Sequence, residues 1–102
     1  MSTKKKILYI DMDGVLVNFQ TGIDKLTESE RLMYKGEEKN VPNIFSKMEP
    51  IEGAIEAYKV LAEKFDTYIL STAPWNNETA LGDKVAWAKK YLGDTIYKRL
   101  IL

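Results

Sequence analysis

The 102-residue sequence contains no cysteine and no histidine. Those two absences exclude disulfides, thiol nucleophiles, Ser-His-Asp triads and the usual zinc ligands. Any catalytic chemistry in this chain must therefore use carboxylates, hydroxyls, lysines, backbone amides and a hard metal ion.

An excess of either charge and a long apolar run are also lacking. The 15 lysines and arginines balance the 15 aspartates and glutamates, so bulk charge does not attract nucleic acid, and we expect no nucleic-acid partner. After Lys4-Lys5-Lys6 only four apolar residues precede Asp11. A signal peptide needs about 7–15 apolar residues and a membrane span about 20, so we expect a cytoplasmic protein without a membrane partner.

Short apolar runs rich in strand-forming residues are present. The first is typical of a strand that is buried on both faces of a parallel sheet. The three predicted strands are residues 7–10, 68–72 and 98–102.

Apolar residues at helical spacing separate these strands. They predict a helix over 54–65 and another with Val85, Ala88 and Leu92 inward and Gly93 as its end. The alternation predicts an α/β fold, a Rossmann-like parallel sheet with flanking helices, which we expect to be truncated after its third strand. We also expect a helix to open over 18–29, followed by a charged linker or loose helix over 28–40.

Two aspartates, Asp11 and Asp13, directly follow the first predicted strand. Alternate side chains of an extended segment point the same way, and open α/β sheets bind ligands at the carboxyl ends of strands. Two convergent carboxylates become stable around a hard divalent cation, for which magnesium is the natural choice. One aspartate can then attack phosphorus while its neighbour transfers protons. The pair therefore predicts a phosphoryl-transfer site with Asp11 and Asp13 as catalytic residues and metal ligands.

Further candidates for phosphate binding lie near these aspartates and after the second strand. Gly14 lets the chain turn and brings backbone amides close to a ligand, and Ser71, Thr72 and Ala73 offer hydroxyls and amides. A D-x-D pair alone often caps a helix or lies solvated in a turn. The apolar run before it and the D-G-V turn after it favour function. A Ser-Thr pair is more often a cap or turn, and its strand-end position leaves both readings open.

Two stretches carry a resemblance to a known family. DMDGVLVNF at 11–19 resembles motif one, and YILSTAPW at 68–75 motif two, of the haloacid-dehalogenase-like phosphatases. Within that superfamily the chain is most similar to the 5'(3')-deoxyribonucleotidases, through Phe19, MEPIEGAIEAY at 48–58 and KVAWAKKYLGD at 84–94.

The resemblance implies a division of the chain and a role for each motif. Residues 1–18 and 49–102 would form a partial core, and residues 19–48 a small helical cap. Asp11 would be the nucleophile and Asp13 the general acid/base, with the backbone carbonyl of Asp13 also on magnesium. Thr72 would be the motif-two hydroxyl, with Ser71 as the alternative one residue away.

The resemblance also implies the substrate, a nucleoside monophosphate whose base is contacted by aromatic residues. The candidates are Phe19, Phe45 and Trp75. The alternative for all three is core packing, although the polar neighbours Asn76 and Asn77 weaken that alternative for Trp75.

The sequence departs from the family pattern in two places. A motif-three lysine and the motif-four acidic metal ligands are expected after the third and fourth strands, and neither follows here. Lys84, Lys89 and Lys90 are expected on a solvated helix face. Three alternatives follow: an inactive fragment of a deoxyribonucleotidase, a non-catalytic remnant of the fold, or a superfamily phosphatase for another phosphate ester. An open edge at Ile7–Ile10 would permit self-association.

Overall fold

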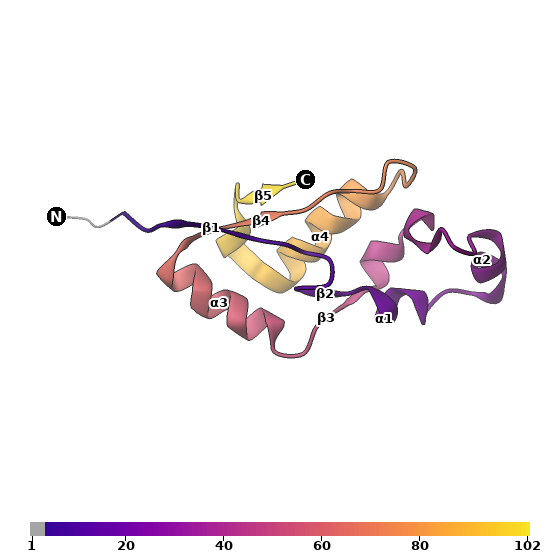
Figure 1. Cartoon of the computed structure of the whole chain (residues 1–102), viewed down its shortest axis with the longest axis horizontal. Helices are drawn as coiled ribbons and strands as arrows, with labels where there is room; N and C mark the ends of the chain where they lie inside the picture. Colours follow the sequence, from indigo (N-terminus) through magenta and orange to yellow (C-terminus); the bar gives the residue numbers. More distant parts are fainter. Residues whose placement is uncertain (1–3) are drawn as a thin grey trace.

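A three-stranded parallel sheet organises the molecule (Figure 1). The computed structural model describes residues 4–102, so the first three residues of the predicted 1–18 segment lie outside the described residues. The strand order is β1-β4-β5, where β1 is Ile7–Ile10, β4 is Asp66–Leu70 and β5 is Leu100–Ile101. The predicted α/β fold with a parallel sheet is confirmed. The second strand begins two residues earlier than predicted and ends before Ser71, and the third is shorter than predicted.

Two helices follow the predicted pattern and pack together. The helix α3 covers Ala54–Lys64, and α4 covers Ala80–Leu92 before the short helix η3, Gly93–Ile96. Gly93 ends α4 with a φ of 68°, a left-handed value that favours glycine. Both crossovers step the same way along the sheet, and right-handed crossovers then place both helices on one face. None of the helices within 4–102 combines the length and apolar character that a membrane span requires.

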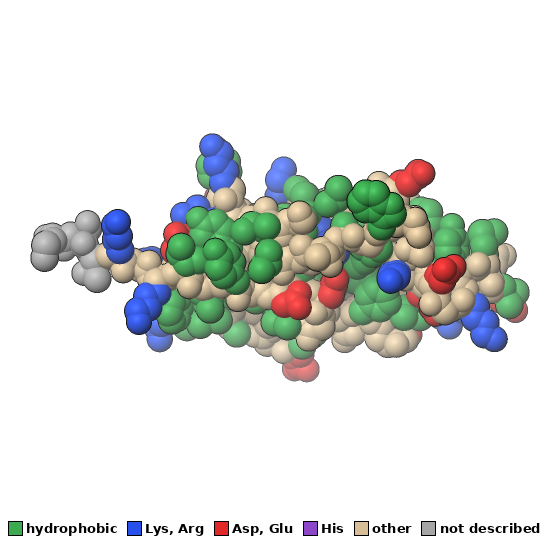
Figure 2. All heavy atoms as spheres, turned by 45° about the horizontal axis from the view of Figure 1, so that its top comes forward, with side chains coloured by type: hydrophobic (Ala, Val, Ile, Leu, Met, Phe, Trp, Pro, Cys, Tyr) green, Lys and Arg blue, Asp and Glu red, His purple; other side chains and the backbone are tan. Residues whose placement is uncertain are grey.

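The two faces of the sheet differ in burial. Thr67 and Ile69 point to the helices and are buried. On the opposite face Ile7 and Tyr9 are each more than half exposed, and Figure 2 shows hydrophobic side chains gathered over the sheet. The prediction that the first strand is buried on both faces is therefore wrong. Strand propensity identifies the strand, whereas its burial depends on which elements stand opposite each face.

A small helical region lies beside the sheet, on the right of Figure 1. It is entered and left through β2 (Val17–Asn18) and β3 (Glu49–Pro50), which pair antiparallel. Between them lie α1, α2, η1 and η2, whose bounds are Phe19–Ile23, Glu28–Met33, Glu38–Asn40 and Ile44–Lys47. We call residues 19–48 the cap; the division of the chain into core and cap stays a prediction.

The expected single helix over 18–29 is in fact two short helices. Thr27 caps a new helix, because its hydroxyl accepts the Glu30 amide while the Glu30 carboxylate accepts the Thr27 amide. The T-x-x-E spacing was the sequence signal for this break. Close packing also holds α1 in place: a Cβ at Gly22 would lie 2.7 Å from Met48 Cγ.

Candidate functional site

The carboxyl ends of β1 and β4 lie side by side, because the two strands are parallel neighbours. The structure therefore brings together the two polar segments that were predicted from the sequence as one site. A hollow of about 530 Å³ at this edge is lined by Tyr9, Asp11, Leu70, Ser71 and Thr72.

The two aspartates differ in their surroundings. Asp11 is exposed, and its Oδ1 accepts the Met12 amide at 2.7 Å. Asp13 is partly buried; its Oδ2 accepts a hydrogen bond, whereas its buried Oδ1 has no partner among the described residues. Met12, between them, is buried in the core. One carboxylate thus faces solvent and the other is half enclosed.

The turn after the aspartates fixes the direction of Asp13. Gly14 has a φ of 77°, and its amide donates to the Val17 carbonyl at 3.0 Å. The amide of Val17 returns to the Met12 carbonyl at 2.9 Å. The Gly14 amide, a predicted phosphate donor, is therefore already used inside the turn, while the Asp13 carbonyl takes no part in this pair of bonds.

A lysine completes the site. Lys84 on α4 is fully buried, and its Nζ donates to Asp13 Oδ2 at 2.8 Å. The same ammonium donates to Ser71 Oγ at 2.9 Å and to the Thr72 carbonyl at 2.6 Å. All three ammonium protons therefore have an acceptor. Lys84 links the segment after β1 to the segment after β4.

The expectation that Lys84 lies on a solvated helix face is wrong. Lys84 lies four residues after Ala80 and four before Ala88, both of which are buried, so it belongs to the apolar stripe of the helix. A single lysine inside that stripe was the signal that sequence reasoning missed. Lys89 and Lys90, by contrast, are exposed as expected.

The predicted phosphate-binding residues after β4 are not equivalent. Ser71 is buried, its hydroxyl accepts from Lys84, and its amide donates to the Ile101 carbonyl at 2.8 Å. Thr72 is exposed at the hollow, and Ala73 is partly buried against the core. The hydroxyl that faces open space is therefore the one of Thr72.

The three aromatic candidates separate into a pair and a single residue. Phe19 and Phe45 meet edge to face, with ring centroids 6.0 Å apart. Phe45 is buried, and the Lys84 Nζ lies 4.7 Å from its ring centroid, a cation–π contact. Trp75 is 97% exposed and so does not pack with them. Phe45 thus adjoins the site, with Phe19 against it, while Trp75 stands in solvent on the loop after β4.

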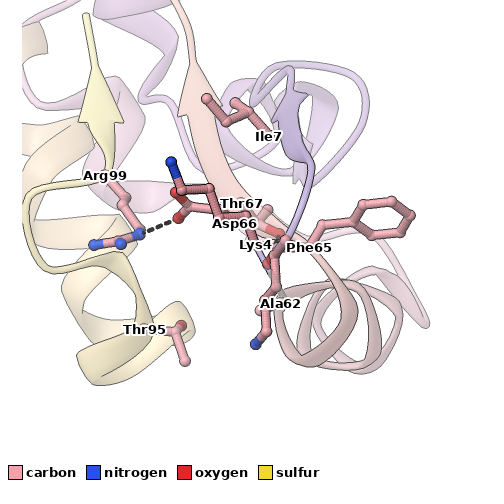
Figure 3. Close-up of a pocket in the computed structure, with 9 residues that line it drawn as sticks. Lys4, Ile7, Ala62, Phe65, Asp66, Thr67, Thr95 and Arg99 are labelled. Carbon is pink, nitrogen blue, oxygen red and sulfur yellow. Dashed lines mark hydrogen bonds and ion pairs between the residues drawn. The ribbon is translucent and has the colours of Figure 1, made fainter. Parts of the chain in front are cut away.

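A second hollow lies at the opposite end of the strands, where β1 and β4 begin (Figure 3). It has a volume of about 540 Å³ and contains the ion pair between Arg99 Nε and Asp66 Oδ1, 2.8 Å apart. The hydrogen bond from Arg99 to Asp66, with the charge of that carboxylate, raises the pKa of Arg99. None of the predicted site residues lines this hollow.

Comparison with known proteins identifies a matching family, and the similar proteins include two from viruses. The family model described as "5' nucleotidase, deoxy (Pyrimidine), cytosolic type C protein" matches residues 25–102. A Vibrio phage KVP40 protein named "Putative 5'(3')-deoxyribonucleotidase" is 54% identical over 100 residues, which cover 98% of this chain and 59% of that protein.

The second relative comes from Acanthamoeba polyphaga mimivirus and is named "Putative 5'(3')-deoxyribonucleotidase R824". It is 30% identical over 120 residues, which cover 91% of this chain and 54% of that protein. The chain therefore spans somewhat more than half the length of these relatives.

Proposed function

This chain belongs to the family of 5' nucleotidase, deoxy (Pyrimidine), cytosolic type C proteins, and from that membership we propose a specific activity. The protein is a magnesium-dependent 5'(3')-deoxyribonucleotidase that hydrolyses nucleoside monophosphates through an aspartyl-phosphate. The observation that carries the proposal is the contact of the buried Lys84 with Asp13, Ser71 and the Thr72 carbonyl at the carboxyl ends of two parallel strands, where Asp11 lines a hollow together with Ser71 and Thr72.

The donor set at this site suits a hard cation. Asp11 offers an exposed carboxylate, and Asp13 offers a buried Oδ1 without a protein partner in the described part of the chain. Carboxylate and backbone carbonyl oxygens are ligands of the kind that magnesium prefers. Asp11, through its carboxylate, and Asp13, through its backbone carbonyl, would hold the metal, which when bound supplies positive charge against the phosphoryl oxygens. Oδ1 of Asp13 then stays available to carry a proton. Within residues 4–102, no three or more acidic residues are grouped so that they could hold a metal ion by themselves.

The residues of the site then divide the two steps of the reaction between them. The Asp11 carboxylate attacks phosphorus, and the bond from phosphorus to the leaving oxygen breaks as Asp13 gives that oxygen a proton. Water next attacks the aspartyl-phosphate while Asp13 takes its proton, and phosphate leaves with Asp11 restored. Lys84 holds the Asp13 carboxylate in place at 2.8 Å and supplies the cation that the family assigns to its motif-three lysine.

Thr72 is our choice for the motif-two hydroxyl. Its side chain is exposed at the hollow beside Asp11, whereas the Ser71 hydroxyl already accepts a hydrogen bond from Lys84. Replacing Thr72 by valine is therefore expected to raise KM for the phosphate ester, and Thr72→Ser to preserve it.

The nucleophile is tested by Asp11→Asn. Phosphate release is followed at high chain concentration over hours, so that slow turnover is detectable. We expect the variant to lose turnover by on the order of 10⁴-fold, down to the rate in buffer, because a catalytic unit loses most of its effect when one member is removed. Asp94→Asn, at an exposed aspartate that does not line the hollow beside Asp11, is the control and should behave like wild type. Near-normal hydrolysis by Asp11→Asn would show that Asp11 is not the nucleophile.

The substrate class is tested with a panel of phosphate esters. Phe19 is partly buried and lies against Phe45, so its ring can border a bound base, and truncating a stacking aromatic costs about 1–3 kcal/mol. Nucleoside monophosphates should be hydrolysed better than sugar phosphates, and Phe19→Ala should narrow that difference. Trp75→Ala tests the exposed candidate in the same assay. Best turnover on a sugar phosphate would instead favour a superfamily phosphatase for another ester.

We also propose that the 102-residue chain alone turns over slowly. In its support, the described residues offer no group of three or more acidic side chains that could hold a metal ion. Each missing electrostatic contact to a transferring phosphoryl group costs on the order of 10²-fold in rate. The test compares the rate of phosphate release by this chain with that of the KVP40 protein under the same conditions. Equal rates would mean that Asp11, Asp13 and Lys84 suffice.

Self-association is a further proposal. Within residues 4–102, β1 pairs only with β4, so the other edge of β1 is open to a strand of a second copy. The Ile7 and Tyr9 side chains are exposed on the sheet face without helices, where a second copy could also pack. Sedimentation velocity over a range of concentrations should show association that Tyr9→Lys reduces. Val60→Lys, at an exposed apolar position of α3, is the control. A wild-type chain that stays monomeric would contradict this proposal.

A further inference from the structure

Asn77 is a buried asparagine in the loop that joins β4 to α4, and each polar atom of its side chain has a partner. The residue is 5% exposed, and Nδ2 donates to the Lys39 carbonyl at 2.8 Å and the Val41 carbonyl at 3.0 Å. Oδ1 accepts the Thr79 amide at 3.1 Å and lies 3.1 Å from the Thr79 hydroxyl. The neighbouring Asn76 is exposed, so burial is specific to Asn77.

These partners belong to two different parts of the molecule. Lys39 and Val41 lie in the cap, whereas Thr79 is the N-cap residue of α4. The Thr79 hydroxyl also accepts the Asn43 amide at 2.7 Å. Three backbone groups of residues 39–43 are therefore bound by the loop and the start of α4. We call this set of hydrogen bonds the clasp.

The clasp lies next to the elements that carry Phe45 and Lys84. Residues 39–43 lead directly into η2, which carries Phe45, and α4 leads from Thr79 to Lys84. At the other end of η2, Trp87 Nε1 of α4 donates to the Met48 carbonyl at 3.0 Å. Phe45 is thus held between two attachments to the same helix, with its ring against the Lys84 ammonium.

We propose that Asn77 is a positioning residue that holds the cap on α4 and thereby sets the affinity of the site for a nucleoside monophosphate. Asn77 contacts none of Asp11, Asp13 or Lys84; it acts through residues 39–43, which fix where Phe45 lies. The part that concerns affinity rests on the proposed function. The clasp itself does not, because it is made of contacts within the chain.

The clasp is tested by hydrogen–deuterium exchange on the chain without substrate. Asn77→Asp keeps the size of the side chain, removes both N–H donors and turns a carboxylate toward two carbonyls. The Asn43 amide should then exchange about tenfold faster or more, since an unsatisfied buried group costs at least one hydrogen bond's worth of stability. The Asp66 amide, which donates to the Lys6 carbonyl in the sheet, should keep its rate. Asn76→Asp adds the same charge one residue away and should change neither amide.

The positioning role is tested by equilibrium binding of a deoxynucleoside monophosphate. Asn77→Asp should weaken binding about tenfold, the equivalent of one lost buried hydrogen bond, while Asn76→Asp binds like wild type. Thr79→Val, which removes the hydroxyl that holds Asn43, should weaken binding as well, and Thr79→Ser should restore it. The Thr79 pair keeps the test valid even if Asn77→Asp fails to fold.

The outcomes separate the claims. Unchanged exchange at Asn43 in both Asn77→Asp and Thr79→Val would overturn the clasp, whatever the protein binds. Faster exchange with unchanged affinity would overturn the positioning role and leave a purely structural contact. A wild-type chain that binds no nucleotide would overturn the proposed function and the affinity claim with it, whereas the exchange result would still decide whether the clasp exists.

Discussion

The two ends of the same strands each hold an ion pair, with the same distance of 2.8 Å between the charged atoms. At the carboxyl end, the Lys84 side chain is 0% exposed and meets Asp13, whose side chain is 38% exposed. At the amino end, the side chains of Arg99 and Asp66 are 39% and 32% exposed. Equal distance thus accompanies a cation that is fully buried at one end and partly exposed at the other. The distance between the charged atoms alone does not show how far a cation is shielded from water.

Burial changes what each pair requires of its surroundings. A buried ammonium costs free energy unless its protons are accepted, and Lys84 has Ser71 and Thr72 as further acceptors besides Asp13. Burying the Lys84 ammonium therefore requires several acceptors around it, and these come from the segments that follow β1 and β4. Arg99 needs no such arrangement, because water reaches it.

The largest effect should come from Asp13→Ala at the carboxyl end. This change leaves the fully buried Lys84 ammonium without its counter-charge, and an uncompensated buried charge costs about 3 kcal/mol. We expect a large fall in the free energy of unfolding, measured by urea denaturation, and complete loss of turnover. Asp66→Ala is the matched control at the amino end and should change stability much less. Similar losses in both variants would remove the distinction between the two ends.

Lys84→Met should separate stability from activity. The variant removes the buried charge itself, leaving Ser71 Oγ without its donor, so stability falls by about 1–3 kcal/mol, less than for Asp13→Ala. Phosphate release, in contrast, should fall by about 10²-fold or more, because a cation at the phosphoryl-transfer site is lost. Lys89→Met, on the exposed side of the same helix, should leave both unchanged. Normal turnover in Lys84→Met would make the lysine structural only.

Arg99→Met should have a small effect, sensitive to salt. Exposed pairs are screened by ions, and the Debye length shrinks to about 3 Å at 1 M salt. We expect the wild type and the variant to differ slightly in melting temperature at low salt and to converge at 1 M. The difference between wild type and Lys84→Met should persist at high salt, since that pair is screened less. If salt reduced the melting-temperature differences of Arg99→Met and Lys84→Met equally, the two ion pairs would not differ in their shielding from solvent.

The smallest effect should come from a carboxylate outside both ends, Glu30 in the cap. The hydrogen bond from the Thr27 backbone amide lowers the pKa of Glu30, with smaller contributions from the Thr27 hydroxyl and Lys47. A lowered pKa stabilises the fold above the pKa of the unfolded chain, and this contribution is lost as pH falls through the folded value. At pH 6 the melting temperature of Glu30→Gln should therefore be slightly lower than that of wild type. This difference in melting temperature should disappear as the pH falls toward 3.

The sequence predicted those parts of the fold that depend on neighbours along the chain. The run at Ile7–Ile10 gave the first strand, and the helical spacing gave α3 and the end of α4 at Gly93. The capping box at Thr27 was equally local, and reading it would have divided the expected helix over 18–29. The D-x-D pair at a strand end predicted the position of the candidate site.

Features that depend on distant parts of the chain were not predicted. The exposure of Ile7 and Tyr9 follows from having both long helices on one face of the sheet, which strand patterns do not reveal. The burial of Lys84 depends on how α4 packs against η2 and the segments that follow β1 and β4. Its i and i+4 apolar neighbours indicated an inward position, but its charge argued for solvent. The acceptors that resolve this conflict, Asp13 among them, are up to 71 residues away.

The enclosure of Lys84 also makes it chemically distinct. Of the 13 lysines in the sequence, 11 are exposed, Lys47 is half-buried and Lys84 is buried. An acylating reagent reacts with free, unprotonated amines. A limiting dose should therefore modify the other lysines and spare Lys84, whose ammonium donates three hydrogen bonds to protein oxygens. Acylation of Lys84 would require the cap and α4 to separate first. The rate at which that one amine is acylated, read by mass spectrometry, would therefore report how often the native chain opens there.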